Sequence, residues 1–471
     1  MLLPKLEKLL CARPLLRGMK KRVPIGAIVA SCKNLGESMK IMIRKAARKP
    51  RDRFVKRLIE GLERQENSIQ ALADANFRAR VKLKLAQKQA ITVLFVCHMP
   101  QLWSMFESIY YAMMEVLDFN AIVVALPYSH PTLPEGQYKD DGTFEYLKER
   151  GINVIRGYDK EREEWLEPTS IDPDYVFFQQ PYPLLSPMWS VEKISMIARI
   201  GYVSYGPQLS KGGLERTTNP EGFFRYVRLF FMDCDFDRAA LDMKFKDRNW
   251  FNKERVFVTG NPALDYLAKN GELCGRVWKR GMRKDVKRIL WTPRWCTWEG
   301  TCHFFDYKDY FSEFCKTHQA VDFVFRPHPL CFQNFLKTGE MSVEELESMK
   351  ASYENSANMV IDSIPCYEDT FLTSDFLISD HSSMLVEYIA TGKPIIYTHR
   401  VDLFNEYGRS LSKGMYWVKT TKELDKTISM LLSGEDPLRE KRAELINSLL
   451  FMPKDGSGRL ITEYLRADYR K

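Results

Sequence analysis

The segment from Ser374 to Glu387 holds the residues best suited to bind a phosphorylated ligand. A short apolar run predicts a strand that ends at Ser379, and a helix is predicted to begin near Ser382. Ser382 and Ser383 then lie where free backbone N–H groups converge, which favours a diphosphate. Glu387 follows one helical turn after Ser383 and can accept hydrogen bonds from ribose hydroxyls. Alternatively, Ser382 only caps the helix and Glu387 lies on the surface.

A second group follows the strand predicted at 322–326, in the sequence Arg326-Pro327-His328-Pro329. Ligands of open α/β sheets bind beyond the carboxyl ends of strands. The guanidinium of Arg326 offers a fork for phosphate oxygens. His328 can donate to a phosphate or transfer a proton near neutral pH, so we predict that it is catalytic. The alternative is a surface histidine in a proline turn.

Two more predicted strand ends add candidates for donor binding. Arg294 follows the strand at 288–292 and lies between two indoles, Trp291 and Trp295. Gly260 and Asn261 form a Gly-Asn-Pro turn, where a backbone without a Cβ atom can approach a ligand closely. Neither motif is specific by itself.

In order and spacing, these motifs resemble the CDP-glycerol glycerophosphotransferase family, the teichoic-acid-type polymerases and primases. The resemblance covers roughly residues 255–400 and rests on Gly260-Asn261-Pro262 with Asp265, Thr292-Pro293-Arg294-Trp295, Arg326-Pro327-His328-Pro329, Ser379-Asp380-His381-Ser382-Ser383 with Glu387, and Lys393-Pro394. It implies a GT-B-like fold, a CDP-polyol donor, and a cytoplasmic enzyme attached peripherally to the inner face of the cell membrane.

The chain departs from the family pattern at three positions. His381 stands where the family usually has Tyr, and Glu387 where it has Asp. Tyr205 stands where the family has a His that looks like the catalytic base, and a Tyr of ordinary pKa is a poor base at neutral pH. His98 and His130 are the predicted substitutes, although His98 is equally consistent with a buried structural role. His381 stays in the predicted donor-binding set.

Short apolar runs alternate with helical stretches, which predicts an α/β fold with parallel sheets. Strands are expected at 91–96, 121–126, 152–155, 175–178 and 202–205, and a second series at 255–259, 288–292, 322–326, 375–379 and 394–397. We expect two Rossmann-like domains that face a cleft, with their division within 235–254. The predicted parts are a basic helical extension (1–88), an acceptor-side domain (89–245), and a nucleotide-donor domain with C-terminal helices (246–471).

The positive charge of the chain is concentrated at its N-terminus. The net charge is +9 over 471 residues, but residues 1–60 alone carry +13, which leaves −4 for the rest. Residues 1–50 contain basic amphipathic segments that predict attachment to an anionic membrane surface, although a solvated helical face explains them equally well. Apolar residues at helical spacing from Phe54 to Leu85 predict a long packed helix. No membrane-spanning helix or signal peptide is expected.

The resemblance implies a transferase that moves glycerol phosphate or ribitol phosphate from a CDP-activated donor to a cell-envelope polymer, such as teichoic acid or capsule, or to a lipid-linked acceptor, and releases CMP. A GT-B glycosyltransferase that uses a nucleotide sugar is the alternative. A nucleic-acid-binding or scaffold protein is more distant, because the body outside the basic arm is net negative. The ten cysteines lack the spacing of a zinc site and are expected to be free thiols, so neither a metal nor a cofactor is predicted.

Overall fold

The computed structural model describes residues 53–129, 133–134, 136–204, 208–211, 221–268, 274–399 and 402–471. The chain divides into two compact units, Met1–Leu72 and Ala73–Lys471. The membrane arm predicted at 1–50 lies outside the described residues, and so do His130 and Tyr205. Both sheets that carry the predicted motifs lie within the larger unit.

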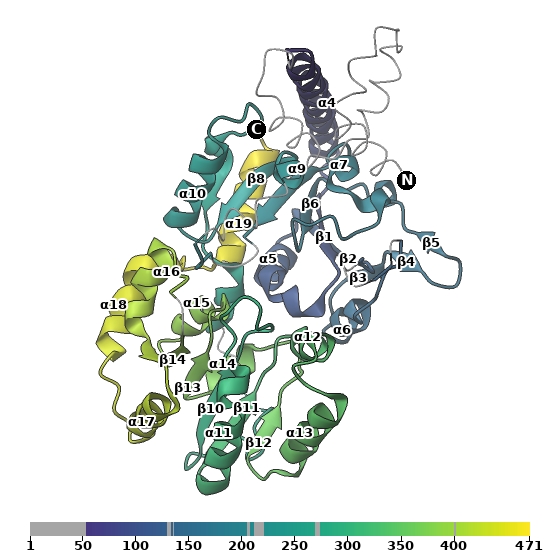
Figure 1. Cartoon of the computed structure of the whole chain (residues 1–471). Helices are drawn as coiled ribbons and strands as arrows, with labels where there is room; N and C mark the ends of the chain where they lie inside the picture. Colours follow the sequence, from purple (N-terminus) through teal and green to yellow (C-terminus); the bar gives the residue numbers. More distant parts are fainter. Residues whose placement is uncertain are drawn as a thin grey trace, which may run out of the picture. The chain divides into compact units, whose positions relative to one another are not determined.

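The first sheet has seven parallel strands in the order β3-β2-β1-β6-β7-β8-β9 (Figure 1). Its strands are β1 Ile91–Cys97, β2 Phe119–Ala125, β3 Val154–Arg156, β6 Tyr175–Phe178, β7 Arg199–Val203, β8 Val227–Met232 and β9 Val256–Val258. Every residue of β1, β6, β7 and β8 is buried. Helices cover both faces of such a sheet, so these strands are almost continuously apolar, and this explains why most of them were predictable.

The second sheet has six parallel strands in the order β12-β11-β10-β13-β14-β15. They are β10 Lys287–Thr292, β11 Val321–Phe325, β12 Met359–Ile361, β13 Phe376–Ser379, β14 Ile395–Thr398 and β15 Tyr416–Val418. Its helices include α11 Phe304–Thr317, α12 Cys331–Thr338, α13 Val343–Asn355, α14 Glu368–Thr373, α15 Met384–Ile389, α16 Glu406–Leu411, α17 Thr421–Leu432 and α18 Arg439–Leu449. The predicted α/β class with parallel sheets is confirmed.

One strand belongs to a different sheet from the one predicted. The run at 255–259 was expected to open the second series, but it forms β9, which pairs with β8 in the first sheet. The chain therefore passes from one sheet to the other after Val258. The predicted division at 245/246 does not coincide with the change of sheet.

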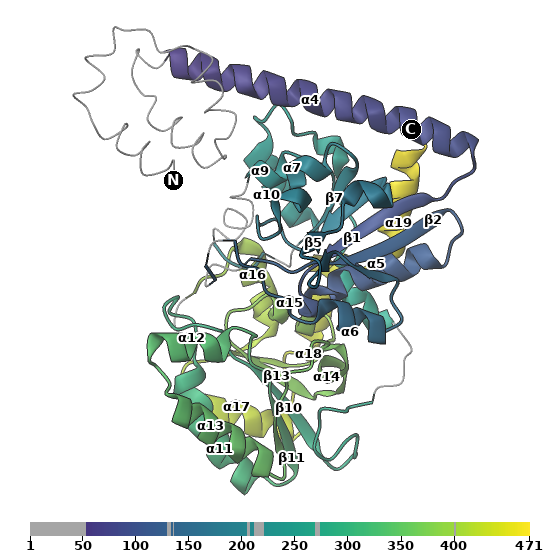
Figure 2. The same cartoon turned by 90° about the vertical axis from the view of Figure 1, so that its right-hand side faces the viewer.

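The C-terminal helix α19 (Ser457–Tyr469) packs on the first sheet and not on the second, whereas it was expected in the donor domain. Its residues Ile461 and Leu465 are fully buried in the core that includes β1 and helix α5 (Ser104–Met114). Figure 2 shows α19, in yellow, beside the blue strands of this sheet. The Asp265 carboxylate accepts bonds of 2.9 Å from the N–H groups of Ser457 and Gly458, and so caps the start of α19.

The helix predicted at 54–85 is present as α4 (Arg53–Ala86), but only part of its apolar pattern is packed. Phe77 and Val81 are buried in the core of the first sheet. Ile69, Leu72 and Leu85 are 46%, 59% and 44% exposed. The helix is therefore confirmed, and the prediction that its whole apolar face is packed is wrong.

Candidate functional site

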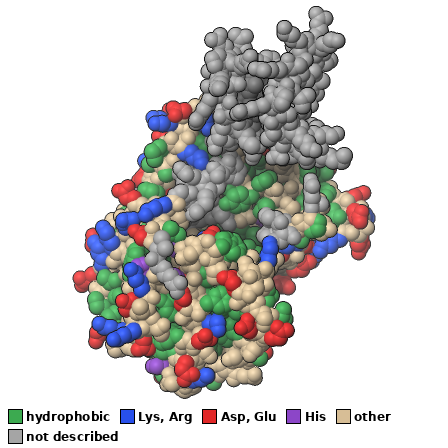
Figure 3. All heavy atoms as spheres, in the orientation of Figure 1, with side chains coloured by type: hydrophobic (Ala, Val, Ile, Leu, Met, Phe, Trp, Pro, Cys, Tyr) green, Lys and Arg blue, Asp and Glu red, His purple; other side chains and the backbone are tan. Residues whose placement is uncertain are grey.

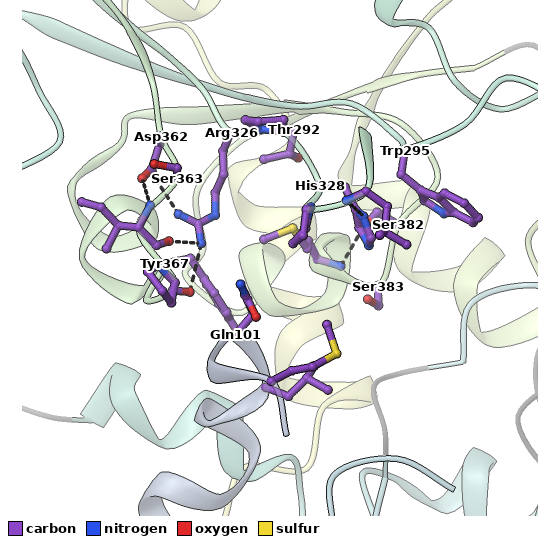
Figure 4. Close-up of a pocket in the computed structure, with 18 of the residues that line it drawn as sticks. Gln101, Thr292, Trp295, Arg326, His328, Asp362, Ser363, Tyr367, Ser382 and Ser383 are labelled. Atoms are coloured by element: carbon purple, nitrogen blue, oxygen red, sulfur yellow. Dashed lines mark hydrogen bonds and ion pairs between the residues drawn. The ribbon is translucent and has the colours of Figure 1, made fainter. Parts of the chain in front are cut away.

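A pocket of about 1550 Å³ lies between the loops that follow the strands of the two sheets. Arg326, His328, Ser382 and Ser383 all line it, which is the arrangement predicted for the cleft (Figure 4). The loops after β1, β2, β6 and β7 supply the opposite wall. Because all strands in each sheet are parallel, their carboxyl ends meet at one edge, and this brings distant motifs together.

The strand order of the second sheet reverses between β10 and β13, which is where ligands of doubly wound sheets bind. Thr292 ends β10 and Ser379 ends β13. The Thr292 hydroxyl donates to the Ser379 hydroxyl at 2.9 Å, and the Ser379 hydroxyl donates to the Thr292 carbonyl at 2.8 Å. These buried bonds hold the two strand ends together, and the loops that carry Arg294 and Ser382 begin beside them.

Arg326 lines the pocket, but its guanidinium is already held by neighbours. Nη1 lies 2.5 Å from the carboxylate of Asp362, and Nη2 donates to the carbonyls of Ile364 and Pro365 at 2.7 and 3.1 Å. The Asp362 side chain is fully buried and that of Arg326 is 11% exposed. The guanidinium that was predicted to be free for phosphate is therefore already bound within the protein. These bonds hold the loop 362–367 in place and fix the position of the positive charge.

The guanidinium of Arg294 is also held by hydrogen bonds within the protein. Its Nε donates to Glu299 at 2.6 Å, and Nη1 donates to the carbonyl of His381 at 2.7 Å. The fully buried carboxylate of Asp380 accepts the backbone N–H groups of Arg294 and His303, each at 2.9 Å. Burial raises the pKa of Asp380. This aspartate therefore ties the loop after β10 to the loop after β13.

His328 is exposed within the pocket wall, and its ring centroid is 5.8 Å from that of Trp295. The backbone N–H of Leu330 donates to Nδ1 at 3.1 Å. A ring nitrogen that accepts a bond carries no proton, so the neutral ring has its proton on Nε2 and can donate from there. Desolvation in the concave wall, helped by the positive charge of Arg294, lowers the pKa of His328. The geometry therefore suits a neutral hydrogen-bond donor.

The residues after β13 reach the pocket as predicted, with one difference. Helix α15 begins at Met384 and has only six residues, and the Ser382 hydroxyl accepts a bond of 3.3 Å from the Met384 N–H. Ser383 is exposed in the pocket. Glu387 does not lie on an open surface: it lines the pocket and accepts a hydrogen bond from the hydroxyl of Tyr367. Desolvation raises the pKa of Glu387 to about 7.

Two predicted histidines do not reach the pocket. His381 is 4% exposed, and its ring nitrogens lie 2.7 Å from the Ser210 hydroxyl and 3.3 Å from the Tyr397 hydroxyl. His98 is 3% exposed, with Nε2 at 3.0 Å from Oε1 of Gln180. Burial lowers the pKa of His98 to about 4. Both are held in the interior, as the alternative interpretation of His98 expected.

The Gly260-Asn261 turn also differs from its prediction. Asn261 lines the pocket, but its side chain closes the turn by accepting the Ala263 N–H at 2.9 Å. Gly260 has φ +78°, and a Cβ atom there would lie 2.4 Å from the carbonyl oxygen of Phe451. The close approach that requires glycine is therefore to the C-terminal segment of the chain and not to a ligand.

Sequence reasoning missed Asp362, Tyr367 and Gln101, all of which line the pocket. Asp362 follows β12, a strand of only three residues, and gives no motif of its own. Tyr367 connects the two walls, because its hydroxyl lies 3.3 Å from the hydroxyl of Ser104 at the start of α5. Gln101 lies in the short 3-10 helix η3 (Pro100–Leu102) after β1.

Among the described residues, no helix combines the length and apolar character needed to cross a bilayer. No group of three or more His, Cys, Asp or Glu side chains among them is arranged around a common point for a metal ion. Figure 3 shows basic and acidic side chains interspersed over the visible face, whereas nucleic-acid binding favours a continuous basic patch.

Residues 240–424 match the model of the CDP-glycerol:poly(glycerophosphate) glycerophosphotransferase family, which confirms the resemblance. No curated protein matches the chain. A variant of the wall teichoic acid polymerase TagF has the same fold, with a TM-score of 0.55, 15% identity, and coverage of 93% of this chain and 99% of that one. A UDP-N-acetylglucosamine 2-epimerase gives a TM-score of 0.52, 16% identity, and coverage of 81% and 96%. S. aureus MnaA solved with UDP gives a TM-score of 0.52, 13% identity, and coverage of 81% of this chain and 97% of that one. These similarities confirm a GT-B-like fold.

Proposed function

We propose that this chain, a transferase of the CDP-glycerol glycerophosphotransferase type, moves glycerol phosphate or ribitol phosphate from a CDP-activated donor to an acceptor hydroxyl and releases CMP. The observation that carries the proposal is the pocket at the switch point of the second sheet. There, hydroxyl, imidazole and guanidinium groups from three strand ends meet within the residues that match the family model.

In the proposed reaction, an oxygen of the acceptor attacks the β-phosphorus of the donor. A new P–O bond forms, the bond to the CMP oxygen breaks, and the hydroxyl proton passes to a base. Negative charge accumulates on the phosphoryl oxygens and on the leaving CMP. Ser382 and Ser383 donate to these oxygens, and the fixed positive charges of Arg294 and Arg326 stabilise them, because groups held in place need no reorganisation during the reaction.

His328 donates through Nε2–H to the transferred phosphoryl group in this proposal. The Leu330 N–H occupies Nδ1, so the ring is already oriented for that role. The base for the acceptor is a separate question, because His98 is buried away from the pocket. His130, which was predicted from the sequence and lies outside the described residues, is the proposed base.

Glu387 is proposed to bind the ribose of the donor. Its carboxylate faces the pocket and pairs with the Tyr367 hydroxyl, and ribose hydroxyls would donate to it in the same way. The acceptor is proposed to be a cell-envelope polymer, such as teichoic acid or capsule, or a lipid-linked precursor. Attachment to the inner face of the cell membrane is proposed through residues 1–50, which carry the excess positive charge.

The direct test is to incubate the full chain with a panel of nucleotide-activated polyols and sugars, and to identify the nucleotide released. Release of CMP from CDP-glycerol or CDP-ribitol supports the proposal. Release of a nucleoside diphosphate from a nucleotide sugar would instead support a glycosyltransferase, since attack then takes place at the anomeric carbon. The His328→Ala variant is the control, because CMP released by a contaminating enzyme would not depend on it.

A further inference from the structure

Helix α4 packs on the first sheet through the face that carries Phe77, Val81 and Lys84, each 6% exposed. The rings of Phe77 and Tyr175 meet edge-on, with their centroids 5.6 Å apart. Lys84 Nζ lies 3.1 Å from the carboxylate of Asp174, whose side chain is fully buried. These contacts satisfy one face of the helix, which is called the docked face below. Figure 2 shows α4 as one long continuous helix.

A second face of α4 carries apolar side chains that are exposed to solvent. Its exposed residues recur alternately four and three positions apart and are called the α4 seam: Gln65, Ile69, Leu72, Asn76, Ala79 and Leu83. Ile69, Leu72 and Leu83 are 46%, 59% and 58% exposed. The sequence continues the same spacing at positions 62, 58 and 55, which are Leu, Leu and Val. At 100° per residue, the seam is turned from the docked face by about 130°, so a partner can cover it while α4 stays on the sheet.

The spacing of the seam indicates what kind of partner covers it. Strict alternation of three and four positions is the pattern of a helix that winds around another helix. A helix that only packs on its own protein needs one apolar stripe, whereas α4 has a second stripe beside the docked face. Contiguous exposed apolar surface marks an interaction site. The partner of the seam is therefore a helix that runs along α4.

The two polar residues of the seam favour a second copy of α4 as that helix. Gln65 and Asn76 lie at equal distances along the chain from the midpoint between Ile69 and Leu72. An antiparallel copy centred on that midpoint places Gln65 opposite Asn76, and Ile69 opposite Leu72. Amide then meets amide, and apolar side chain meets apolar side chain. A parallel copy would instead place Ala79 opposite Ala79 and leave a gap between the helices.

The helix is long enough for a specific interface. Its 34 residues span about 51 Å. A strip about 10 Å wide along each helix gives a total buried area of roughly 1,000 Å², the lower end of the range for specific protein–protein interfaces. None of the six seam residues lines the pocket. The interface and the candidate active site are therefore separate features of the chain.

We infer that two copies of this chain associate through an antiparallel coiled coil between their α4 helices. At its centre, Ile69 of each copy packs on Leu72 of the other. On both sides of the centre, Gln65 of one copy pairs with Asn76 of the other. These two polar layers fix the register, because a shifted helix would bury an amide without a partner. The inference concerns assembly and does not depend on the proposed function.

The first test is sedimentation equilibrium of the full chain, for which a dimer is expected. Leu72→Asp should raise the Kd of the dimer at least about a hundredfold, because a carboxylate then enters both central layers. Leu85→Asp is the matched control, since Leu85 is 44% exposed on the same helix but outside the seam, and its Kd should stay within about twofold.

Two outcomes of this measurement overturn the inference. One is a full chain that stays monomeric at about 100 µM, which includes the case in which residues 1–50 of the same chain cover the seam. The other is a Leu72→Asp dimer as tight as that of the unchanged chain, because another surface then holds the two copies together.

A pair of double variants tests the orientation of the helices. Gln65→Glu with Asn76→Lys places opposite charges face to face in the antiparallel arrangement, whereas Gln65→Glu with Asn76→Glu places like charges there. The first variant should dimerise at least about tenfold more tightly than the second. In a parallel pair both variants bring like charges together, so equal Kd values would overturn the antiparallel coiled coil.

Nucleotide release, measured on the same proteins, separates this inference from the proposed function. Leu72 lies outside the pocket lining, so CMP release per chain at saturating donor should stay within about twofold in Leu72→Asp. A chain that dimerises through the seam but releases no nucleotide upholds the inference and removes the proposed function. A monomeric chain that releases CMP upholds the proposed function and overturns the inference.

Discussion

Two sets of loops line one pocket, but they are stabilised in different ways. The first set follows strands β10, β11, β12 and β13 of the second sheet, and the other set follows β1, β2, β6 and β7 of the first sheet. In the second sheet, Arg326 pairs with buried Asp362, and the backbone of Arg294 is bound by buried Asp380. In the first sheet, the strand ends present amides and hydroxyls, such as Gln101 and Ser104. The charged wall has its charges fixed in advance by buried carboxylates, and the described residues that line the other wall include no charged side chain.

This difference assigns separate tasks to the two walls. Fixed charge stabilises a phosphoryl group whose charge changes during the reaction. In the proposed reaction, the wall without charged side chains is the one that faces the acceptor. If the comparison is right, changes to the Arg326–Asp362 ion pair and to His328 should affect the fold or the chemical step strongly, and changes elsewhere should affect binding.

The largest expected effect is on the free energy of unfolding, from loss of the Arg326–Asp362 ion pair in the charged wall. Asp362→Ala leaves the guanidinium of Arg326 poorly exposed and without its carboxylate, and such a loss costs about 3 kcal/mol or more of unfolding free energy. Urea unfolding of the two proteins measures it. Asp285→Ala is the control, because the Arg283–Asp285 pair is exposed and its removal should leave the urea midpoint unchanged. Equal urea midpoints for the unchanged protein and both variants would contradict a stabilising role of the Arg326–Asp362 pair.

The next effect is on turnover. His328→Ala removes the proposed donor to the transferred phosphoryl group and should lower kcat about a hundredfold, the scale of one lost transition-state donor. The KM for the donor should change little, because Ser382, Ser383 and Arg326 still hold the ground-state phosphates. His318→Ala, an exposed histidine outside the pocket lining, is the control. Near-normal turnover of the His328 variant would make the Arg-Pro-His-Pro segment a structural turn.

The strand ends that bear the motifs were predictable because buried parallel strands are continuous apolar runs. Strand β8 was missed because Arg228 interrupts such a run, and that arginine is buried beside Asp74, with its Nε 3.3 Å from the carboxylate. The sheet to which β9 belongs depends on which strand it pairs with, and a single run of residues carries no such information. Strands β12 and β15, of three residues each, were not predicted either.

Within the site, sequence reasoning predicted which residues follow strand ends but not which way their side chains turn. His381 and Ser382 are neighbours in the chain, yet the first packs against Tyr397 and only the second lines the pocket. Gly260 was predicted to approach a ligand, but the contact that excludes a side chain there is with Phe451, nearly 200 positions later in the sequence. Orientation and long-range packing decide these cases, and a motif specifies neither.

A smaller effect should appear in the pH dependence of donor binding. Burial raises the pKa of Glu387 to about 7, so the carboxylate becomes the main form only above that pH. If ribose hydroxyls donate to it, CDP-glycerol should bind up to about tenfold more tightly at pH 8 than at pH 6. Its substituted diphosphate does not titrate in this range, and the neutral His328 does not either, because its pKa is lowered.

Glu387→Gln should make donor affinity independent of pH, and this is measured by calorimetry across pH 6 to 8. The same raised pKa has a consequence for stability with the opposite dependence on pH. The protonated carboxyl stabilises the fold below its ordinary pKa, and this contribution is lost as the pH rises through about 7. Donor affinity that keeps its pH dependence in the Gln variant would remove Glu387 from the ribose site.

The smallest effect on turnover is expected from removing residues 1–50. This stretch carries the excess positive charge of the chain and none of the predicted catalytic or donor-binding residues, so turnover of a soluble acceptor should change less than about twofold. Binding to vesicles that contain anionic lipid should instead fall sharply, because each basic residue near such a surface contributes about 1 kcal/mol. Vesicle flotation and CMP release, measured on the same two proteins, separate the outcomes. Unchanged flotation would refute the membrane role, and a large loss of turnover with a soluble acceptor would mean that the two walls described above do not make up the whole site.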